Sequence, residues 1–350
     1  MAKRRRSGEP LAPPLVPAST FFLPGDPAGQ VYRYGREGNP TWSALEEEYA
    51  ALGRAPCLAF ASGMAACAAI VDGLVPRGGR VVAPADGYYA FRSLLQARGV
   101  EVESVPSGDS RAFARAARGA TLVWVETPSN PGLDVADLAA TAEACRAAGA
   151  LLVVDNTLAT AVGQDPFAFG ADVVVVSATK ATSGHSDALI GLASARDAAV
   201  LAKLKTARTL GGGIPGVMEA WLCARGLKTL ALRLARSSSS ALALAQALSG
   251  RMPVTYPGLP SHPQHTLAAR QMTHFGPVLT FDLGSKDRAE RFCAGLQWIA
   301  EATSFGGAET TLERRARWGG DDVSPGLIRL SVGLEAPEAI LDDLNTALGR

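Results

Sequence analysis

The stretch that decides the fold reads VVVVSATKATSGHSD and covers residues 173–187. Four consecutive valines predict a strand buried on both faces, which is typical of a parallel sheet covered by helices. Lys180 follows this strand within four residues, although the chain has six lysines against 28 arginines. A rare lysine directly behind a buried strand suggests that it has a chemical task.

Five similar apolar runs precede this one, and alanine-rich stretches with helical character separate them. Strands that alternate with helices at this spacing predict an α/β fold with a mostly parallel sheet. The runs are CLAFAS (57–62), RVVAP (80–84), VEVESV (100–105), TLVWVET (121–127) and LLVVDN (151–156).

The sequence pattern differs before and after the region of alternating strands and helices. Residues 217–248 have a long helical pattern, and beyond residue 252 isolated strands (277–283, 327–334) alternate with helices (286–299, 337–348). Residues 11–41 are rich in Pro, Gly and aromatic residues without a clear period. We therefore predict an extended arm over residues 1–41, a ligand-binding α/β domain over 42–236 and a smaller α+β domain over 237–350.

Composition excludes several classes of protein. An apolar content of 47% with 19% charged residues describes a globular chain of 350 residues, large enough for two domains. A net charge of +1 gives no electrostatic reason to expect nucleic acid or an acidic membrane as partner. The five scattered cysteines and the four histidines lack metal-ligand spacing. We expect a cytoplasmic protein without a membrane span or a metal site.

Polar residues cluster where the predicted strands end, and ligands bind at the carboxyl ends of strands in such sheets. Ser62, Gly63 and Met64 follow the first run and open a helix, whose free N–H groups would hold a phosphate. Asp155 ends another run, and hydroxyl groups precede the lysine. The residues after the deciding strand are Ser177, Thr179 and Lys180.

Together these residues supply what pyridoxal phosphate (PLP) needs: a lysine for covalent attachment, a phosphate site and a carboxylate for the ring nitrogen. Each one alone has an ordinary explanation. Ser62 and Asp155 could simply cap helices, and Lys180 could lie in solvent. Their order on successive strands favours the cofactor site.

At this point the sequence resembles a known family, the PLP-dependent transsulfuration enzymes. These include cystathionine γ-lyase, γ-synthase and β-lyase, methionine γ-lyase and O-acetylhomoserine sulfhydrylase. The resemblance implies the PLP-dependent transferase fold type I, with a mostly parallel large domain and a smaller C-terminal α+β domain. The matching motifs are APPLVPASTF, YGREGNPT, FASGMAA, ETPSNP, VVDNT, SATK with GHSD, RGLKTLALR, YPGL with HPQH, SFGGAET and LIRLSVGLE.

The resemblance also implies roles for individual residues. Lys180 would carry the cofactor, Asp155 would hold its ring nitrogen, and Tyr88 would stack on the ring and take part in proton transfer. The phosphate site would consist of Gly63, Met64, Ser177 and Thr179, with Ser62 in the same turn. Tyr34 and Arg36 match a pair that reaches the phosphate of a neighbouring subunit. Substrate would meet Arg329 through its α-carboxylate, with Asn130 and Ser304 lining the same pocket.

Several positions depart from the family pattern. Tyr89-Ala90-Phe91 replaces the usual Gly-Gly-Thr after the stacking tyrosine. Tyr89 is therefore a second candidate, beside Tyr88, for the tyrosine that stacks on the cofactor ring. The arginine that follows comes one place early, as Arg92. Ala181 replaces a common tyrosine, and Thr303 stands where several members have an acid. The cysteine that methionine γ-lyases place just past the stacking tyrosine is absent.

The expected activity follows from the family alone. We rank γ-elimination of cystathionine to cysteine, 2-oxobutanoate and ammonia first. Replacement at Cγ of an O-acylhomoserine comes second, β-elimination third and a non-catalytic PLP-binding protein last. Because the arm would complete a partner's site, we expect at least a dimer and, by family habit, a homotetramer.

Overall fold

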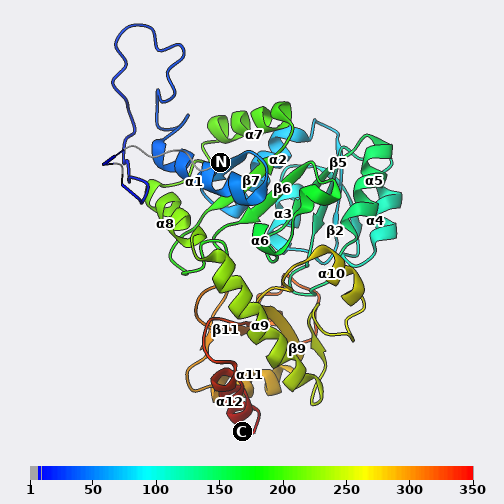
Figure 1. The fold of residues 1–350 in the computed structure, drawn as a ribbon. Coiled ribbons are helices and arrows are strands. Elements are labelled where there is room, and N and C mark those ends of the chain that lie inside the picture. Colours follow the sequence, from blue (N-terminus) through cyan, green and yellow to red (C-terminus); the bar gives the residue numbers. More distant parts are fainter. Residues whose placement is uncertain (1–6, 9, 350) are drawn as a thin grey trace.

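The computed structural model of the chain describes residues 7–8 and 10–349, so the part of the predicted arm before Ser7 lies outside the described residues. The described chain has two parts, each with its own sheet and apolar core (Figure 1). The larger, N-terminal part lies at the top of Figure 1 and the C-terminal part lies below it.

The larger sheet has seven strands in the order β1-β7-β6-β5-β4-β2-β3. All neighbours from β6 to β3 pair in parallel, whereas β7 runs antiparallel to both β1 and β6. The predicted α/β class with a mostly parallel sheet is therefore confirmed. The strands are β1 (Cys57–Phe60), β2 (Arg80–Pro84), β3 (Glu101–Val105), β4 (Leu122–Glu126), β5 (Leu151–Asp155), β6 (Val173–Ser177) and β7 (Gly191–Ala195).

Helices cover both faces of this sheet. Val173 and Val175 of β6 belong to the core that contains residues of α2 (Gly63–Leu74) and α7 (Ala198–Gly211), whereas Val174 belongs to the core with α5 (Leu138–Ala148). Burial on both faces is the reason why the first four residues of this strand are valines. The other helices here are α1 (Pro40–Gly53), α3 (Tyr89–Ala97), α4 (Ser110–Ala116), α6 (Thr160–Gly163), η1 (Pro166–Phe169) and α8 (Val217–Leu227).

The C-terminal part contains a five-stranded sheet in the order β10-β11-β12-β9-β8. Its apolar face packs against helices α9 (Leu230–Ser249), α11 (Lys286–Gly295) and α12 (Pro337–Leu348) to form a separate core. This is the α+β arrangement that the sequence predicts. The strands are β8 (Val254–Thr255), β9 (Val278–Asp282), β10 (Ala300–Glu301), β11 (Thr311–Arg314) and β12 (Leu327–Ser331), and the helices are α10 (His265–Gln271), α11 (Lys286–Gly295), η2 (Arg315–Trp318) and α12 (Pro337–Leu348).

Helix α9 (Leu230–Ser249) joins the two parts, and residue 236, the expected domain boundary, lies inside it. Near its start, Arg233 donates to the carbonyl oxygens of Ala181 and Gly226 in the larger part. Near its end, Leu244 and Leu248 belong to the C-terminal core. The prediction of one helix over 217–248 is wrong, because the chain turns at 228–229 and divides it into α8 and α9.

The N-terminal arm has little regular structure. A bridge pairs Thr20 with Tyr34, and the loop between them projects from the body of the larger part (Figure 1). Phe22 and Val31 on this loop are 91% and 82% exposed. Across the described ranges, no helix is both long enough and apolar enough to cross a membrane.

Candidate active site

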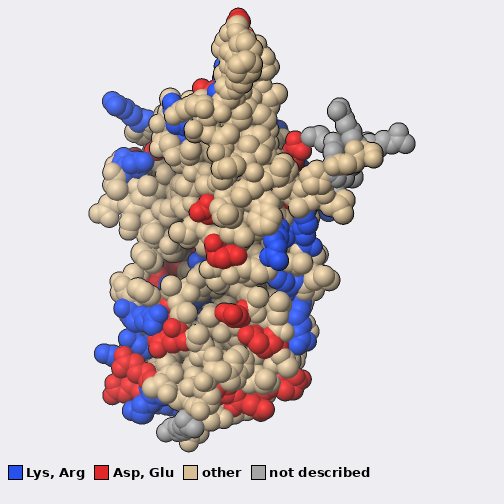
Figure 2. All heavy atoms as spheres, turned by 90° about the vertical axis from the view of Figure 1, so that its left-hand side faces the viewer, with Lys and Arg blue, Asp and Glu red and all other residues tan. Residues whose placement is uncertain are grey.

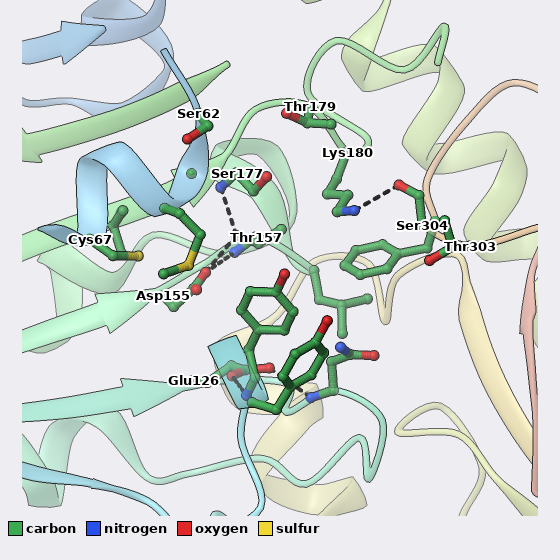
Figure 3. A pocket seen from close by; sticks show the side chains of 18 of the residues that line it. Ser62, Cys67, Glu126, Asp155, Thr157, Ser177, Thr179, Lys180, Thr303 and Ser304 are labelled. Atoms are coloured by element: carbon green, nitrogen blue, oxygen red, sulfur yellow. Dashed lines mark hydrogen bonds between the residues drawn. The ribbon is translucent and has the colours of Figure 1, made fainter. Parts of the chain in front are cut away.

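A cavity of about 440 Å³ is lined by residues of both parts of the chain (Figure 3). Eleven of the thirteen residues expected at the site line it, and Tyr34 and Arg36 do not. The eleven are Ser62, Gly63, Met64, Tyr88, Asn130, Asp155, Ser177, Thr179, Lys180, Ser304 and Arg329. Residues far apart in the sequence therefore meet where the ends of β4, β5 and β6 face loops of the C-terminal part.

Lys180 extends into the cavity from the turn after β6. Its Nζ donates a 2.7 Å hydrogen bond to Oγ of Ser304 in the C-terminal part (Figure 3). Burial, and then the positive charge of Arg329, lower the pKa of Lys180 to about 8. A substantial fraction of this amine is therefore neutral near physiological pH, as a nucleophile or general base requires.

Asp155 ends β5 and is held by a residue that the sequence analysis did not single out. The hydroxyl of Thr157 donates to Oδ1 of Asp155 at 2.5 Å, and the backbone N–H of Thr157 donates to the same oxygen at 2.9 Å. Thr157 Oγ1 also accepts from the backbone N–H of Ser177 at 2.8 Å. Burial raises the pKa of Asp155, and the two bonds from Thr157 oppose this shift. Thr157 thus links the carboxylate to the strand that leads to Lys180.

Glu126 is a second buried acid beside Asp155. The two residues are register partners on neighbouring strands β4 and β5. Glu126 accepts from the backbone N–H groups of Tyr88 and Asn130, each at 2.8 Å, and so fixes two of the expected site residues. Burial and the charge of Asp155 raise the pKa of Glu126 well above its usual range. The sequence shows this acid at the end of a strand, but its partners depend on loop geometry.

The start of α2 forms a cradle against the end of β6. Ser62 caps the helix, because its Oγ accepts from the backbone N–H of Ala65 at 3.0 Å. A Cβ on Gly63 would lie 2.8 Å from Cβ of Ser177, so this close approach requires glycine. The first N–H groups of a helix have no partner within it and can bind phosphate oxygens.

Thr179 lines the cavity, but its hydroxyl has backbone partners. Oγ1 donates to the carbonyl oxygen of Ile190 at 3.2 Å and accepts from the N–H of Ile190 at 2.9 Å. A hydroxyl has one proton to donate. To donate a hydrogen bond to a phosphate, the Thr179 hydroxyl would have to give up its bond to the carbonyl oxygen of Ile190. The sequence does not reveal this competing bond.

Arg329 on β12 lies at the other end of the cavity and is almost fully buried. It donates to Oδ1 of Asn130 at 2.6 Å and to the carbonyl oxygen of Ser304 at 2.7 Å. Burial, and then the charge of Arg315, lower the pKa of Arg329 to about 10. The guanidinium remains charged at neutral pH and suits a carboxylate ligand.

A buried network behind Arg329 was also missed from the sequence. Glu313, the register partner of Arg329 on β11, accepts from Arg329 and Arg315. It also accepts from the indole N–H of Trp318 at 2.7 Å, and Arg315 donates to Asp321. Only the register of an antiparallel pair places these residues together, so no sequence spacing reveals them.

Tyr34 and Arg36 remain on the surface of the single chain. Tyr34 is 46% exposed, and Arg36 donates to the carbonyl oxygen of Thr209 near the end of α7 at 3.0 Å. The guanidinium of Arg36 lies 5.7 Å from the centroid of the Tyr34 ring. Neither side chain lines the cavity of its own chain.

The Tyr89-Ala90-Phe91 departure has a structural explanation. Phe91 stacks on Trp124 in the core, with 3.8 Å between ring centroids. Tyr88 and Tyr89 both line the cavity, and their ring centroids are 5.2 Å apart. Arg92 donates to the carbonyl oxygen of Gly320 in the C-terminal part at 2.8 Å. The altered segment therefore joins the two parts at one side of the cavity.

Known proteins resemble this chain over nearly its whole length. The sequence model of a family described as Cys/Met metabolism PLP-dependent enzyme matches residues 2–349. A Streptomyces coelicolor protein named "Putative cystathionine gamma-lyase" is 48% identical over 351 residues, covering 97% of this chain and 89% of that protein. The cystathionine gamma-lyase of Sus scrofa is 38% identical over 361 residues, covering 97% and 88%.

Solved structures share the fold as well as the sequence. A cystathionine gamma synthase from Xanthomonas oryzae pv. oryzae, crystallised in complex with cystathionine, superposes with a TM-score of 0.91. Its identity to this chain is 35%, and the match covers 97% of this chain and 92% of that chain. Similarity thus extends across both parts and includes the cavity between them.

Proposed function

The chain belongs to the family of Cys/Met metabolism PLP-dependent enzymes, and from this premise we propose that it catalyses the γ-elimination of cystathionine. With one water molecule, cystathionine yields cysteine, 2-oxobutanoate and ammonia. The names of the relatives at 48% and 38% identity support this choice of substrate. Replacement at Cγ of an O-acylhomoserine is the second candidate, because a γ-synthase shares the fold at a TM-score of 0.91.

The residues of the cavity fit pyridoxal phosphate. Gly63 and Met64 would bind the phosphate through the N-terminus of α2, with Ser62 and Ser177 beside them. Asp155, held by Thr157, would keep the ring nitrogen protonated. The bound cofactor supplies a protonated ring that withdraws electrons from the carbon atoms of an attached amino acid.

Lys180 would perform the proton transfers. Its Nζ would hold the cofactor, and the neutral amine would take the proton from Cα of a bound substrate. The same Nζ would move a second proton from Cβ, which allows the thiol to leave Cγ. The hydrogen bond from Nζ to Ser304 and the lowered pKa of Lys180 support this role. Tyr88, fixed through Glu126, would assist these transfers from the other side of the cavity.

Arg329 would hold the substrate in register for these steps. Its guanidinium would bind the α-carboxylate, with Asn130 and Ser304 beside it. Glu313 and Arg315 limit the freedom of the Arg329 side chain from behind. Fixing the carboxylate at one end and the amine at the other places Cα near Lys180.

The single observation that carries this proposal is that one cavity holds the Lys180 amine, the Asp155 carboxylate and the Arg329 guanidinium. The test is to incubate PLP-loaded protein with cystathionine and, separately, with O-acylhomoserines plus cysteine, and to identify the products. Cysteine with 2-oxobutanoate supports γ-elimination, and cystathionine formed from the second mixture supports γ-replacement. Pyruvate with homocysteine would indicate β-elimination. A protein that binds PLP but converts none of these compounds would be a non-catalytic binder, and the proposal would fail.

We propose that the enzyme acts in the cytoplasm. Its proposed assembly is a homotetramer, built from dimers whose two chains share their active sites. The arm projects with exposed apolar side chains, and Tyr34 and Arg36 lie outside the cavity of their own chain. Figure 2 shows that the projecting arm and the surface below it carry few charged side chains, whereas charges are frequent on the C-terminal part. A partner's cavity would give the two arm residues a ligand, the cofactor phosphate.

Mixing two inactive variants tests this assembly. Arg36→Ala removes the arm's charge from the partner's site, and Lys180→Ala removes the amine from its own site. If the arm crosses, dissociated and reassembled mixtures contain some dimers with one intact site, and activity returns. If mixing restores no activity, or if sedimentation shows a fully active monomer, the crossing arm is refuted.

A further inference from the structure

Besides Tyr88, which is 38% exposed, three more large apolar side chains line the cavity and remain exposed to solvent. Tyr89 at the start of α3 is 37% exposed, Leu189 between β6 and β7 is 67% exposed, and Trp318 at the end of η2 is 49% exposed. We call these three residues the outer wall. All three side chains reach solvent, so we place the wall at the mouth of the cavity rather than at its floor.

The charged side chains that line the cavity have partners within the protein. Arg315 lines the cavity, but it donates to Glu313 at 2.6 Å and to Asp321. Glu126 and Asp155 are the carboxylates that line the cavity among the described residues, and both accept hydrogen bonds from neighbouring groups. The mouth therefore offers a ligand mainly apolar and aromatic contact.

Tyr89 and Trp318 of the wall are held in place before any ligand arrives. Arg92 donates to the carbonyl oxygen of Gly320, and a Cβ on Gly320 would lie 2.8 Å from the Tyr89 ring. The loop after η2 is thus pressed against Tyr89. Trp318 is held through its indole N–H by Glu313, which also accepts from Arg329. Contact with a rigid surface costs little conformational entropy.

A leaving thiol has to pass this wall. Arg329 and Lys180 hold the α-carboxylate and Cα deep in the cavity, so the group attached to Cγ must depart through the mouth. The carbon atoms beyond the sulfur would then contact the exposed faces of the wall. Aromatic rings also interact favourably with sulfur.

We propose that Tyr89, Leu189 and Trp318 form a leaving-group subsite that makes the enzyme select γ-thioether amino acids with an extended carbon chain beyond the sulfur. This inference rests on the proposed function and names the substrate feature that the enzyme reads. Cystathionine has such a chain, whereas methionine ends in a single methyl group.

The test is a series of S-alkyl homocysteines with methyl, ethyl and propyl groups, together with cystathionine. In wild type, kcat/KM rises roughly twofold to fourfold for each added methylene, as expected for partial to full burial of that group. Trp318→Leu and Tyr89→Ala flatten this rise, because the longer substrates lose a contact that methionine never makes. The ratio between substrates cancels any general loss of activity.

Matched variants separate contact from positioning. Tyr89→Phe keeps the ring, and Trp318→Phe keeps an aromatic face but loses the bond to Glu313, so both retain the rise even if absolute rates fall. Trp298 is 47% exposed and does not line the cavity, so Trp298→Leu leaves both rate and ratio unchanged. An equal kcat/KM for all thioethers in wild type, or an unaltered rise in Trp318→Leu and Tyr89→Ala, would overturn the subsite. Failure of wild type to convert any of the thioethers would instead refute the proposed function, and the subsite with it.

Discussion

Thr157→Val is the substitution that most directly probes how the site holds its cofactor. Valine keeps the β-branched shape and removes the hydroxyl that donates to Asp155 at 2.5 Å and accepts from the N–H of Ser177 at 2.8 Å. The N–H of Ser177 then loses its acceptor. Asp155 also loses one of the two interactions that oppose the rise of its pKa on burial.

The magnitude follows from these two bonds. A hydrogen bond to a charged group contributes about 1.5–3 kcal/mol, and this is the part that bears on Asp155. If the loss falls on the ionised carboxylate that holds the ring nitrogen, the Kd for pyridoxal phosphate rises roughly tenfold to a hundredfold, at 1.4 kcal/mol per tenfold. The unpaired N–H of Ser177 costs a further ~1–3 kcal/mol in the free energy of unfolding.

The assay has two independent readouts. Cofactor-stripped protein is titrated with pyridoxal phosphate and followed through its visible absorption band, and the stripped protein is unfolded thermally. The pKa of Asp155 should rise further in Thr157→Val. When the solution is acidified, the variant should therefore lose affinity for the cofactor at a higher pH than wild type does. Thr157→Ser keeps the hydroxyl and serves as the matched control. Wild-type affinity, pH dependence and melting temperature in Thr157→Val would refute the reasoning.

Three further predictions concern the same cavity. Gly63→Ala places a Cβ 2.8 Å from Ser177. An overpacking cost of about 1–3 kcal/mol should weaken the binding of pyridoxal phosphate about fivefold or more in a titration, and unchanged affinity would contradict the cradle. Cofactor attachment to stripped protein should accelerate as pH rises, with a midpoint near pH 8, because burial lowers the pKa of Lys180 to about 8 and only the neutral amine attacks. A midpoint near 10, measured by stopped-flow absorbance, would exclude this. Glu313→Gln removes the buried negative charge behind Arg329. This should lower the free energy of unfolding by about 3–5 kcal/mol and raise KM more than it lowers kcat. A melting temperature and a KM equal to those of wild type would show that the network does not position the arginine.

The fold was predictable wherever a strand is rich in branched apolar residues. The runs around β6 and β5 have this character, and each forms a strand of the large sheet. Strand β7 was not predicted, because Gly191–Ala195 consists mostly of small residues. Gly191 is small for a tertiary reason, since a Cβ there would collide with the carbonyl oxygen of Ser62. A sequence pattern does not report such a contact between distant segments.

The turn between α8 and α9 escaped prediction for a similar reason. A Cβ on Gly226 would collide with the carbonyl oxygen of Ser183, so the end of α8 lies directly against the loop that follows Lys180. Helical periodicity continues through residues 217–248 and gives no sign of this approach. Local pattern therefore indicated helix correctly and missed the change of direction.

The rule that ligands meet the carboxyl ends of parallel strands located Asp155 and Lys180 from the sequence. The same rule could have identified Thr157, which lies two residues beyond Asp155. Its hydrogen bonds, however, depend on how the chain turns after β5. The rule could not identify Glu313, because its contact with Arg329 arises from the register of β11 and β12. Residues on parallel strand ends can thus be inferred, whereas partners across an antiparallel pair need the structure.

We propose above all that Lys180 carries the cofactor covalently while Asp155 holds its ring. Borohydride reduction of protein loaded with pyridoxal phosphate, followed by peptide mapping, tests this directly. We expect the label on Lys180 and no label in Lys180→Ala. Label on another lysine, or unlabelled Lys180 in fully loaded protein, would contradict it.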